Sequence, residues 1–189
     1  MADCIDTIVI ENMDFCADQE NPAGVSPVEI FAAKVQDFDS IIAPLALNVA
    51  TTLEEAGSIA GPHTFPADKG FFKITILPET GVVETANQGE KGSKTNSNSF
   101  GGTLPGTGAK VSGFIRKYQN VPMIFLVTQI NGEVKQIGSK ISPAYLSEAS
   151  GNSGIKPGDV QGTPVKFTDV QAYPAPTYTG VITEFTPPV

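Results

Sequence analysis

The sequence predicts a mainly β fold: a β-sandwich or barrel-like pair of sheets, with one packed α-helix and an extended polar β-arm or loop. Three observations support this prediction. Short β-branched and apolar runs recur along the chain, separated by many of its 19 Gly and 15 Pro residues. One segment in the middle repeats its apolar residues at helical spacing. One long polar stretch interrupts the strand pattern.

The length of 189 residues fits one domain with a sizeable core, and we expect a single domain over 1–189. The net charge of −8 is unevenly distributed, because residues 1–60 hold 11 of the 20 Asp and Glu and one of the 12 Lys and Arg. Such a region either is a solvated acidic surface or meets a basic surface on a neighbour. The Lys and Arg residues are not clustered, which argues against tight binding to phosphate backbones.

The two cysteines, Cys4 and Cys16, form no CxxC motif, and reduced thiols are expected. The N-terminus MADCIDTIVI lacks the basic and apolar regions of a secretory signal. No apolar run approaches the roughly 20 residues that span a bilayer. We therefore expect a protein made in the cytosol that does not associate with membranes.

The first part of the chain predicts three strands and two connections. Ile5–Ile10, Val28–Val35 and Leu45–Leu53 are rich in β-branched or apolar residues and are the predicted strands. Glu11–Pro27 is a predicted loop, and Glu54–Lys69 a linker rich in Gly and Pro.

Phe71–Leu77 and Val82–Ala86 are predicted to be paired strands, because Pro78–Gly81 has the residue types of a tight turn. A polar arm at Glu84–Thr103 follows. Ser, Thr and Asn alternate in its second half, near Thr95–Leu104, which suits a further strand.

A helix is predicted at about 107–119. Thr107 is the candidate N-cap, and Pro122 prevents the helix from continuing. An apolar stripe at i, i+3, i+4 and i+7 is typical of a face docked on a sheet. It consists of Val111, Phe114, Ile115 and Tyr118.

Met123–Ile130 is the most apolar run and is predicted to be a central strand. Asn131-Gly132 is a strong hairpin signal that joins it to Glu133–Ile137. The remaining predictions are a long loop at 138–162 and strands at Pro164–Val170 and Tyr178–Phe185, with Val165, Phe167 and Asp169 on one face.

The sequence contains no recognisable catalytic motif. The single histidine, His63, lies between two prolines and reads as a loop residue. No GxSxG motif is present, and the Gly-rich run Gly101–Lys110 lacks the spacing of a phosphate loop or a dinucleotide fingerprint. The acidic pairs read as surface charge. We therefore expect no enzyme, no catalytic residue, no cofactor and no metal site.

The polar arm is the most informative stretch, because it is too long for a tight hairpin turn and has Phe100 as its only large apolar residue. It is either a disordered loop or a β-arm that another subunit completes. It contains no His, Cys, Tyr or Asp, so contact with another chain is a better use than chemistry. The candidate inter-subunit residues are Gln88, Glu90, Lys91, Lys94, Asn96, Asn98 and Phe100.

The order of these features resembles the major tail proteins, or tail tube proteins, of long-tailed phages and prophages. The shared features are a strand, a turn, a long polar arm, an NSF-like strand, a PGxGAxxxGFxRKY helix and a hairpin with NG. The later runs PAYLSEASGNSG and VKFTDVQAYPAPTYTG are also similar to that group. The resemblance covers roughly Glu29 to Gly180.

The resemblance implies a virion structural protein that assembles with itself and with other tail proteins. Rings, commonly hexameric, would stack into a hollow tail tube that conducts DNA to the host without sequence-specific binding. Edge strands and arms would complete the sheets of neighbouring subunits. An acidic excess would suit a lumen along which DNA slides.

Two other functions stay open from the sequence. One is a different phage component, such as a baseplate, tail terminator or head-tail connector protein. The other is a monomeric β-sandwich binding module, against which the missing secretion signal argues.

Overall fold

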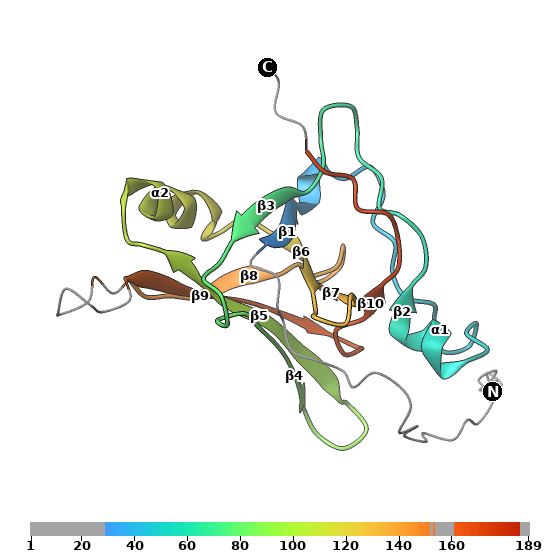
Figure 1. The fold of residues 1–189 in the computed structure, drawn as a ribbon. Helices are drawn as coiled ribbons and strands as arrows, with labels where there is room; N and C mark the ends of the chain where they lie inside the picture. The colour runs from blue at the N-terminus through green and yellow to red at the C-terminus, as the bar shows by residue number, and fades with distance from the viewer. Residues whose placement is uncertain (1–28, 152, 154–160, 186–189) are drawn as a thin grey trace.

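The computed structural model describes residues 29–151, 153 and 161–185 (Figure 1). Strands are the main regular secondary structure of these residues. In chain order, the elements are β1 (Glu29–Lys34), the 3-10 turn η1 (Val35–Asp37), α1 (Leu53–Gly57), β2 (Ser58–Ile59), β3 (Phe72–Thr75), β4 (Val82–Gln88), β5 (Thr95–Pro105), α2 (Ala109–Tyr118), β6 (Met123–Thr128), β7 (Val134–Ile137), β8 (Tyr145–Ala149), β9 (Gly162–Gln171) and β10 (Thr177–Tyr178).

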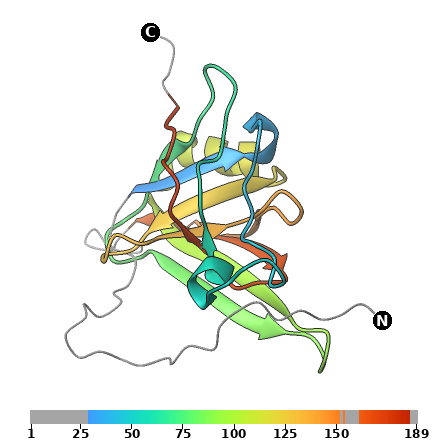
Figure 2. The same cartoon turned by 90° about the vertical axis from the view of Figure 1, so that its right-hand side faces the viewer.

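The strands form two sheets, as predicted. The larger sheet has the order β2-β10-β7-β6-β1-β3, and the smaller has the order β4-β5-β9-β8. All pairs are antiparallel except that of β10 with β2. The sheets lie face to face (Figure 2), and residues from both form one apolar cluster. The chain is thus a mainly β protein built from two sheets, with α2 beside them.

Three phenylalanines mark the centre of the core between the sheets. Phe125 of β6 lies 5.8 Å from Phe100 of β5 and 4.4 Å from Phe167 of β9, measured between ring centroids. All three are at most 1% exposed. Aromatic pairs at these distances add to the stabilisation from buried area, so the three rings help to hold β6 against the smaller sheet.

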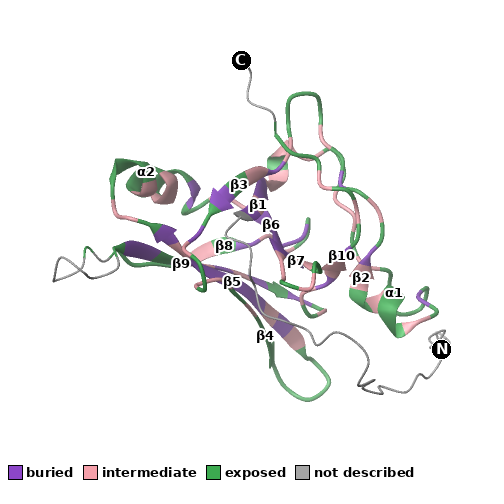
Figure 3. Ribbon diagram, in the orientation of Figure 1, coloured by how far each residue is buried: buried purple, intermediate pink, exposed green. Residues whose placement is uncertain are grey.

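A second apolar cluster covers the other face of the six-stranded sheet. It includes Leu126, Phe71 and Tyr178, and Phe38 packs against it from the segment after β1. The irregular segments after β1 and before β3 contribute most of this cover. Because β6 is buried on both faces (Figure 3), its first five residues, MIFLV, are continuously apolar rather than alternating. The predicted central strand is confirmed.

Helix α2 begins two residues and ends one residue inside the predicted bounds. Its stripe packs as expected: Tyr118 stacks on Phe72 of β3 at 5.4 Å, and Phe114 packs against the core. The predicted N-cap is wrong, because Gly108 occupies that position and no side chain caps the helix. Thr107 Oγ1 instead accepts a hydrogen bond from Gln161 at 3.3 Å.

The predicted strand at Leu45–Leu53 is not formed. Leu47 and Val49 are 70% and 58% exposed, and the N–H groups of Val49 and Ala50 donate to the Ala46 carbonyl in a turn. No strand of the described chain pairs with this segment, so its apolar residues lack the neighbouring strand that a half-buried sheet position requires.

Other expectations need smaller corrections. The linker after Leu53 contains α1 and β2, and the loop at 138–162 contains β8. The last predicted strand, Tyr178–Phe185, is reduced to Thr177–Tyr178 and an isolated bridge between Glu184 and Phe71. The predictions for Ile5–Ile10, Glu11–Pro27, Cys4 and Cys16 lie outside the described residues. Strands are confirmed near all the other predicted positions, and Asn131-Gly132 forms the β6–β7 turn, where Gly132 has φ 86°. The predicted pairing of Phe71–Leu77 with Val82–Ala86 is wrong, because β3 pairs with β1 in the larger sheet and β4 pairs with β5 in the smaller one.

Candidate functional site

The polar arm is an ordered β-hairpin of the smaller sheet. β4 and β5 pair over seven residues, from Val82 with Gly101 to Gln88 with Thr95. The six-residue turn between Gln88 and Thr95 is held by Lys94 Nζ, which donates to the Gly89 carbonyl at 2.6 Å. This turn, residues 89–94, is called the hairpin tip below, and it projects from the sandwich in Figure 1. Of the two conformations that the sequence left open, the β-arm is formed, and it is formed within one chain.

The structure divides the seven candidate residues into two groups. Gln88, Glu90, Lys91 and Lys94 are exposed at or beside the tip. The other three point into the subunit: Asn96 is 7% exposed, Asn98 0% and Phe100 1%. These three residues hold the sandwich together, so they are removed from the candidate contact surface, and the tip is retained.

A buried carboxylate accounts for the polar residues of β5. Asp169 of β9 is 3% exposed and accepts hydrogen bonds from Asn98 Nδ2 at 3.0 Å and Gln171 Nε2 at 2.7 Å, and from the backbone N–H of Gly138. Burial raises the pKa of Asp169 above 3.8, and the three donors act in the opposite direction. Such a carboxylate is tolerated in a core only because its oxygens are bonded.

The hydrogen-bonded chain continues across the six-stranded sheet. The Gly138 carbonyl accepts from Gln136 Nε2 at 3.0 Å, and Gln136 Oε1 lies 2.8 Å from His63 Nε2. His63 Nδ1 accepts from the backbone N–H of Ile42 at 3.1 Å. Since a backbone N–H can only donate, Nδ1 carries no proton and Nε2–H donates to Gln136. The path from Asp169 to His63 is called the buried polar chain.

His63 is a structural residue in an irregular segment. It is 1% exposed and stacks on Tyr178 with ring centroids 4.8 Å apart. Burial lowers its pKa below 6.5, and the bond to Gln136 opposes this only in part. The neutral ring is therefore the form that fits the fold. With a backbone N–H on one nitrogen and an amide on the other, it offers no nitrogen to a substrate.

The two edges of the smaller sheet differ. β8 is interrupted by a bulge between Leu146 and Glu148, which is a common way of preventing further pairing. β4 pairs in unbroken register, has no Pro or Lys, and is exposed along most of its length. Among the described residues its backbone pairs only with β5. β4 is therefore the edge open to another strand.

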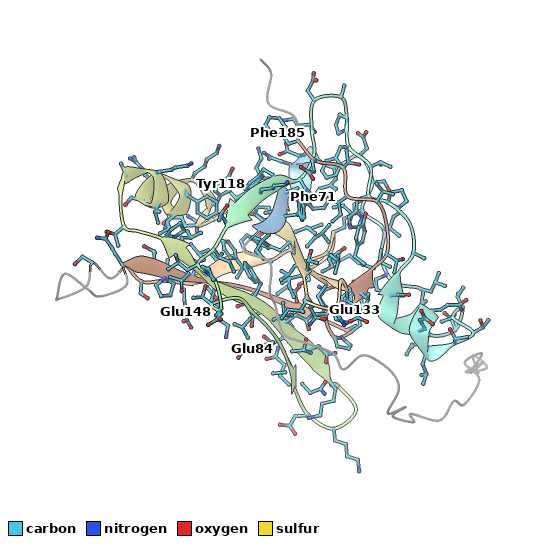
Figure 4. All side chains as sticks on the ribbon, in the orientation of Figure 1. Phe71, Glu84, Tyr118, Glu133, Glu148 and Phe185 are labelled. Carbon is cyan, nitrogen blue, oxygen red and sulfur yellow. The ribbon has the colours of Figure 1, made fainter. Side chains whose placement is uncertain are left out.

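The outward face of the smaller sheet is polar and carries few charges. Lys166 of β9 donates to Glu84 of β4 at 2.8 Å, and Ser147 and Thr168 lie 2.9 Å apart. The bond from Lys166 and its charge lower the pKa of Glu84. Glu148 lies on the same side, below the sheet in Figure 4. The lysine of this face is thus neutralised by a neighbouring carboxylate.

The described residues contain no group of three His, Cys, Asp or Glu side chains that could hold a metal ion. Neither helix in this part of the chain has the length and apolar run that crossing a bilayer requires. The buried polar chain is also closed to chemistry, because its members bond to each other and to the backbone. The tip, the β4 edge and the outward face are candidate contact surfaces.

Sequence reasoning missed the buried polar chain. Asp169 was expected to share a face with Val165 and Phe167, and all three are buried, but no role was predicted for Gln136 or Gly138. One signal was available: Asn96 and Asn98 occupy alternate positions leading to Phe100, so they share its inward face. Polar residues in register with a core phenylalanine indicate buried hydrogen bonds.

No family model, curated protein or solved structure matches this chain.

Proposed function

We propose that this chain is a virion structural protein that assembles into stacked rings of a phage tail tube, through which DNA passes to the host. The observation that carries the proposal is the β4 edge, an open, regular strand that ends in an ordered exposed tip. The order of motifs that resembles tail tube proteins supports the same function.

The two unlike edges suit ring formation. An added strand on β4 would form main-chain hydrogen bonds along seven residues, which is the recognition mode of β-augmentation. The bulged β8 edge discourages a second, competing addition on the other side of the sheet. A contact in which the β4 edge of one copy accepts a different segment of the next copy is heterologous, and heterologous contacts close into rings or continue as filaments.

The outward face of the smaller sheet is the surface proposed to face DNA. Binding to a phosphate backbone requires free cations. The Lys166 ammonium is held by Glu84, and Glu148 adds a further negative charge nearby. A hydroxyl-rich surface without an unpaired cation would let the duplex slide instead of adsorbing.

The decisive variant shortens the tip without touching the core. Residues 89–94 are replaced by Asn-Gly, which forms a two-residue turn between the paired residues Gln88 and Thr95. We expect wild-type protein to form rings or tubes in negative-stain micrographs at high concentration. The shortened variant should keep the wild-type circular dichroism spectrum and lose polymerisation.

A control variant carries Ser112→Ala, an exposed position on α2 far from the tip in sequence. It should polymerise as the wild type does. Normal tubes from the shortened variant would remove the tip from the assembly surface. A monodisperse wild-type monomer at every concentration and salt tested would contradict the tail tube function itself.

The alternatives are separated by stoichiometry and by binding. A tube subunit is present in many copies per particle, whereas a baseplate, terminator or connector protein is present in few. A binding module would stay monomeric and retain a partner in a protein or glycan screen. The hairpin tip would also serve such a module, so oligomeric state is the first measurement.

A further inference from the structure

A groove lies between β3, an edge strand of the six-stranded sheet, and helix α2. It has a volume of about 450 Å³ and runs along all four residues of β3, the last strand on its side of the six-stranded sheet. The opposite wall is formed by α2, through Val111, Phe114 and Tyr118. The groove therefore combines an edge strand with an apolar wall, which is the geometry that accepts an extended peptide as an added strand.

The groove is cationic as well as apolar. Its lining includes Lys110 and also Lys73, which forms an ion pair with Glu184 at 3.3 Å, and it includes no Asp or Glu. Helix α2 has three basic residues and no acidic one. Among the described residues, no carboxylate forms an ion pair with Lys110, Arg116 or Lys117. An acidic extended segment would be favoured there over a neutral or basic one.

The chain contains one segment with the matching chemistry. Residues 1–28 lie outside the described structure, and they hold six Asp or Glu and no Lys or Arg. Within them, Ile5–Ile10 (IDTIVI) has the β-branched residues of a strand and carries Asp6. In either strand register, alternate residues place at least two β-branched side chains on one face.

We propose that Ile5–Ile10 of a neighbouring copy docks in this groove as an additional strand on β3. This inference rests on the proposed self-assembly and names the residues of a second inter-subunit contact. The 18 residues between Ile10 and Glu29 span up to about 60 Å when extended, which is enough to leave one subunit and reach the next. An acidic donor and a cationic acceptor differ chemically, so the contact is head-to-tail and propagates around a ring.

Native Cys4, next to Ile5, provides the test. Cys16→Ser is made in the full chain, and one cysteine is added to the groove lining as Thr75→Cys or, in a second variant, as Lys73→Cys. The matched control is Ser112→Cys, which lies on helix α2 but outside the groove lining. Each protein is concentrated under assembly conditions, oxidised with diamide, and run on a non-reducing denaturing gel beside a negative-stain grid.

If the segment docks from a neighbour, at least one groove-cysteine variant gives a ladder of disulfide-linked dimers and larger oligomers. The control variant gives at least fivefold less of this cross-linked product. A fast-migrating cross-linked monomer would mean that the segment folds back on its own subunit, and this would overturn the proposal. Tubes without any ladder would overturn the docking and leave the tail tube function standing. If neither tubes nor a ladder form, both fail.

Discussion

The two sheets of this protein are stabilised in different ways. The six-stranded sheet is buried on both faces, and its central strand β6 is apolar from Met123 to Val127. The four-stranded sheet is buried on one face only, and the half of that face nearest the hairpin tip is polar: it presents Asn96, Asn98 and Asp169. One sheet relies on area removed from water and the other also on satisfied hydrogen bonds.

This difference indicates which parts of the molecule tolerate substitution. An apolar core tolerates the replacement of one side chain by another of similar volume. A buried, hydrogen-bonded carboxylate such as Asp169 instead destabilises the fold when one of its partners is removed. The sheet with the more demanding interior is the one that presents the tip and the β4 edge. The hydrogen bonds on the inner face of this sheet hold its strands in one arrangement, which also determines the positions of the tip and the β4 edge.

The largest effect is expected from the apolar sheet. Phe125→Ala removes a ring that is 0% exposed and contacts both Phe100 and Phe167. It should lower the free energy of unfolding by about 4 kcal/mol, measured by urea denaturation. Phe185→Ala, at a side chain 37% exposed, is the control and should cost much less. Equal losses would show that the packing of β6 between the sheets does not contribute to the free energy of unfolding.

The next effect tests the polar sheet. Asp169→Ala leaves three buried donors without their acceptor and should cost about 3 kcal/mol in the same measurement. Glu84→Ala removes the carboxylate of an exposed ion pair and should leave the stability close to that of the wild type. If the two variants are equally stable, the buried polar chain does not hold the sheets together.

A pH series sharpens the comparison further. The pKa of His63 is lowered below 6.5 in the folded protein, so the unfolded chain binds the proton more readily. Stability is therefore full above about pH 6.5 and falls as the pH drops below it. The raised pKa of Asp169 has the opposite sign: its folded form retains the proton longer, and its contribution declines as the pH rises above 3.8.

Because the chain has one histidine, the variant His63→Gln isolates the first effect. Between pH 7.5 and 5.5, the wild type should lose more unfolding free energy than this variant does. Parallel curves would mean that protonation of His63 carries no cost in the fold.

The smallest effect on stability is expected at the tip. Lys91→Ala changes an exposed side chain and should leave the free energy of unfolding within about 0.5 kcal/mol of the wild type. A loss above 1 kcal/mol would show that the tip contributes to the fold of the monomer. It would then no longer serve as a surface whose changes affect assembly alone.

The apolar sheet was the easier part to predict from the sequence. Met123–Ile130 and Phe71–Leu77 were found because burial leaves a direct mark on composition. Helix α2 was found from its stripe. Leu45–Leu53 shows the limit of this reasoning, since an apolar run without a neighbouring strand is only an exposed turn. Strand β8 was missed because YLSEA is mostly polar and is interrupted by a bulge.

The polar sheet was predicted only in outline. A strand at Thr95–Leu104 was expected and is confirmed as Thr95–Pro105. Its pairing partners were not foreseen: β5 lies between β4 and β9 of the same chain. Which polar residues are buried depends on contacts such as that between Asn98 and Asp169, 71 positions apart. Local patterns carry no information on such distant pairs.

The chain's only imidazole lies at one end of the buried polar chain, with its Nε2 proton directed at Gln136. A proton in that position is shielded from solvent exchange, so it should give a single resolved downfield signal in a proton NMR spectrum. No second histidine can obscure it. The protein therefore contains an intrinsic reporter, by which the integrity of its interior can be followed without a label, variant by variant.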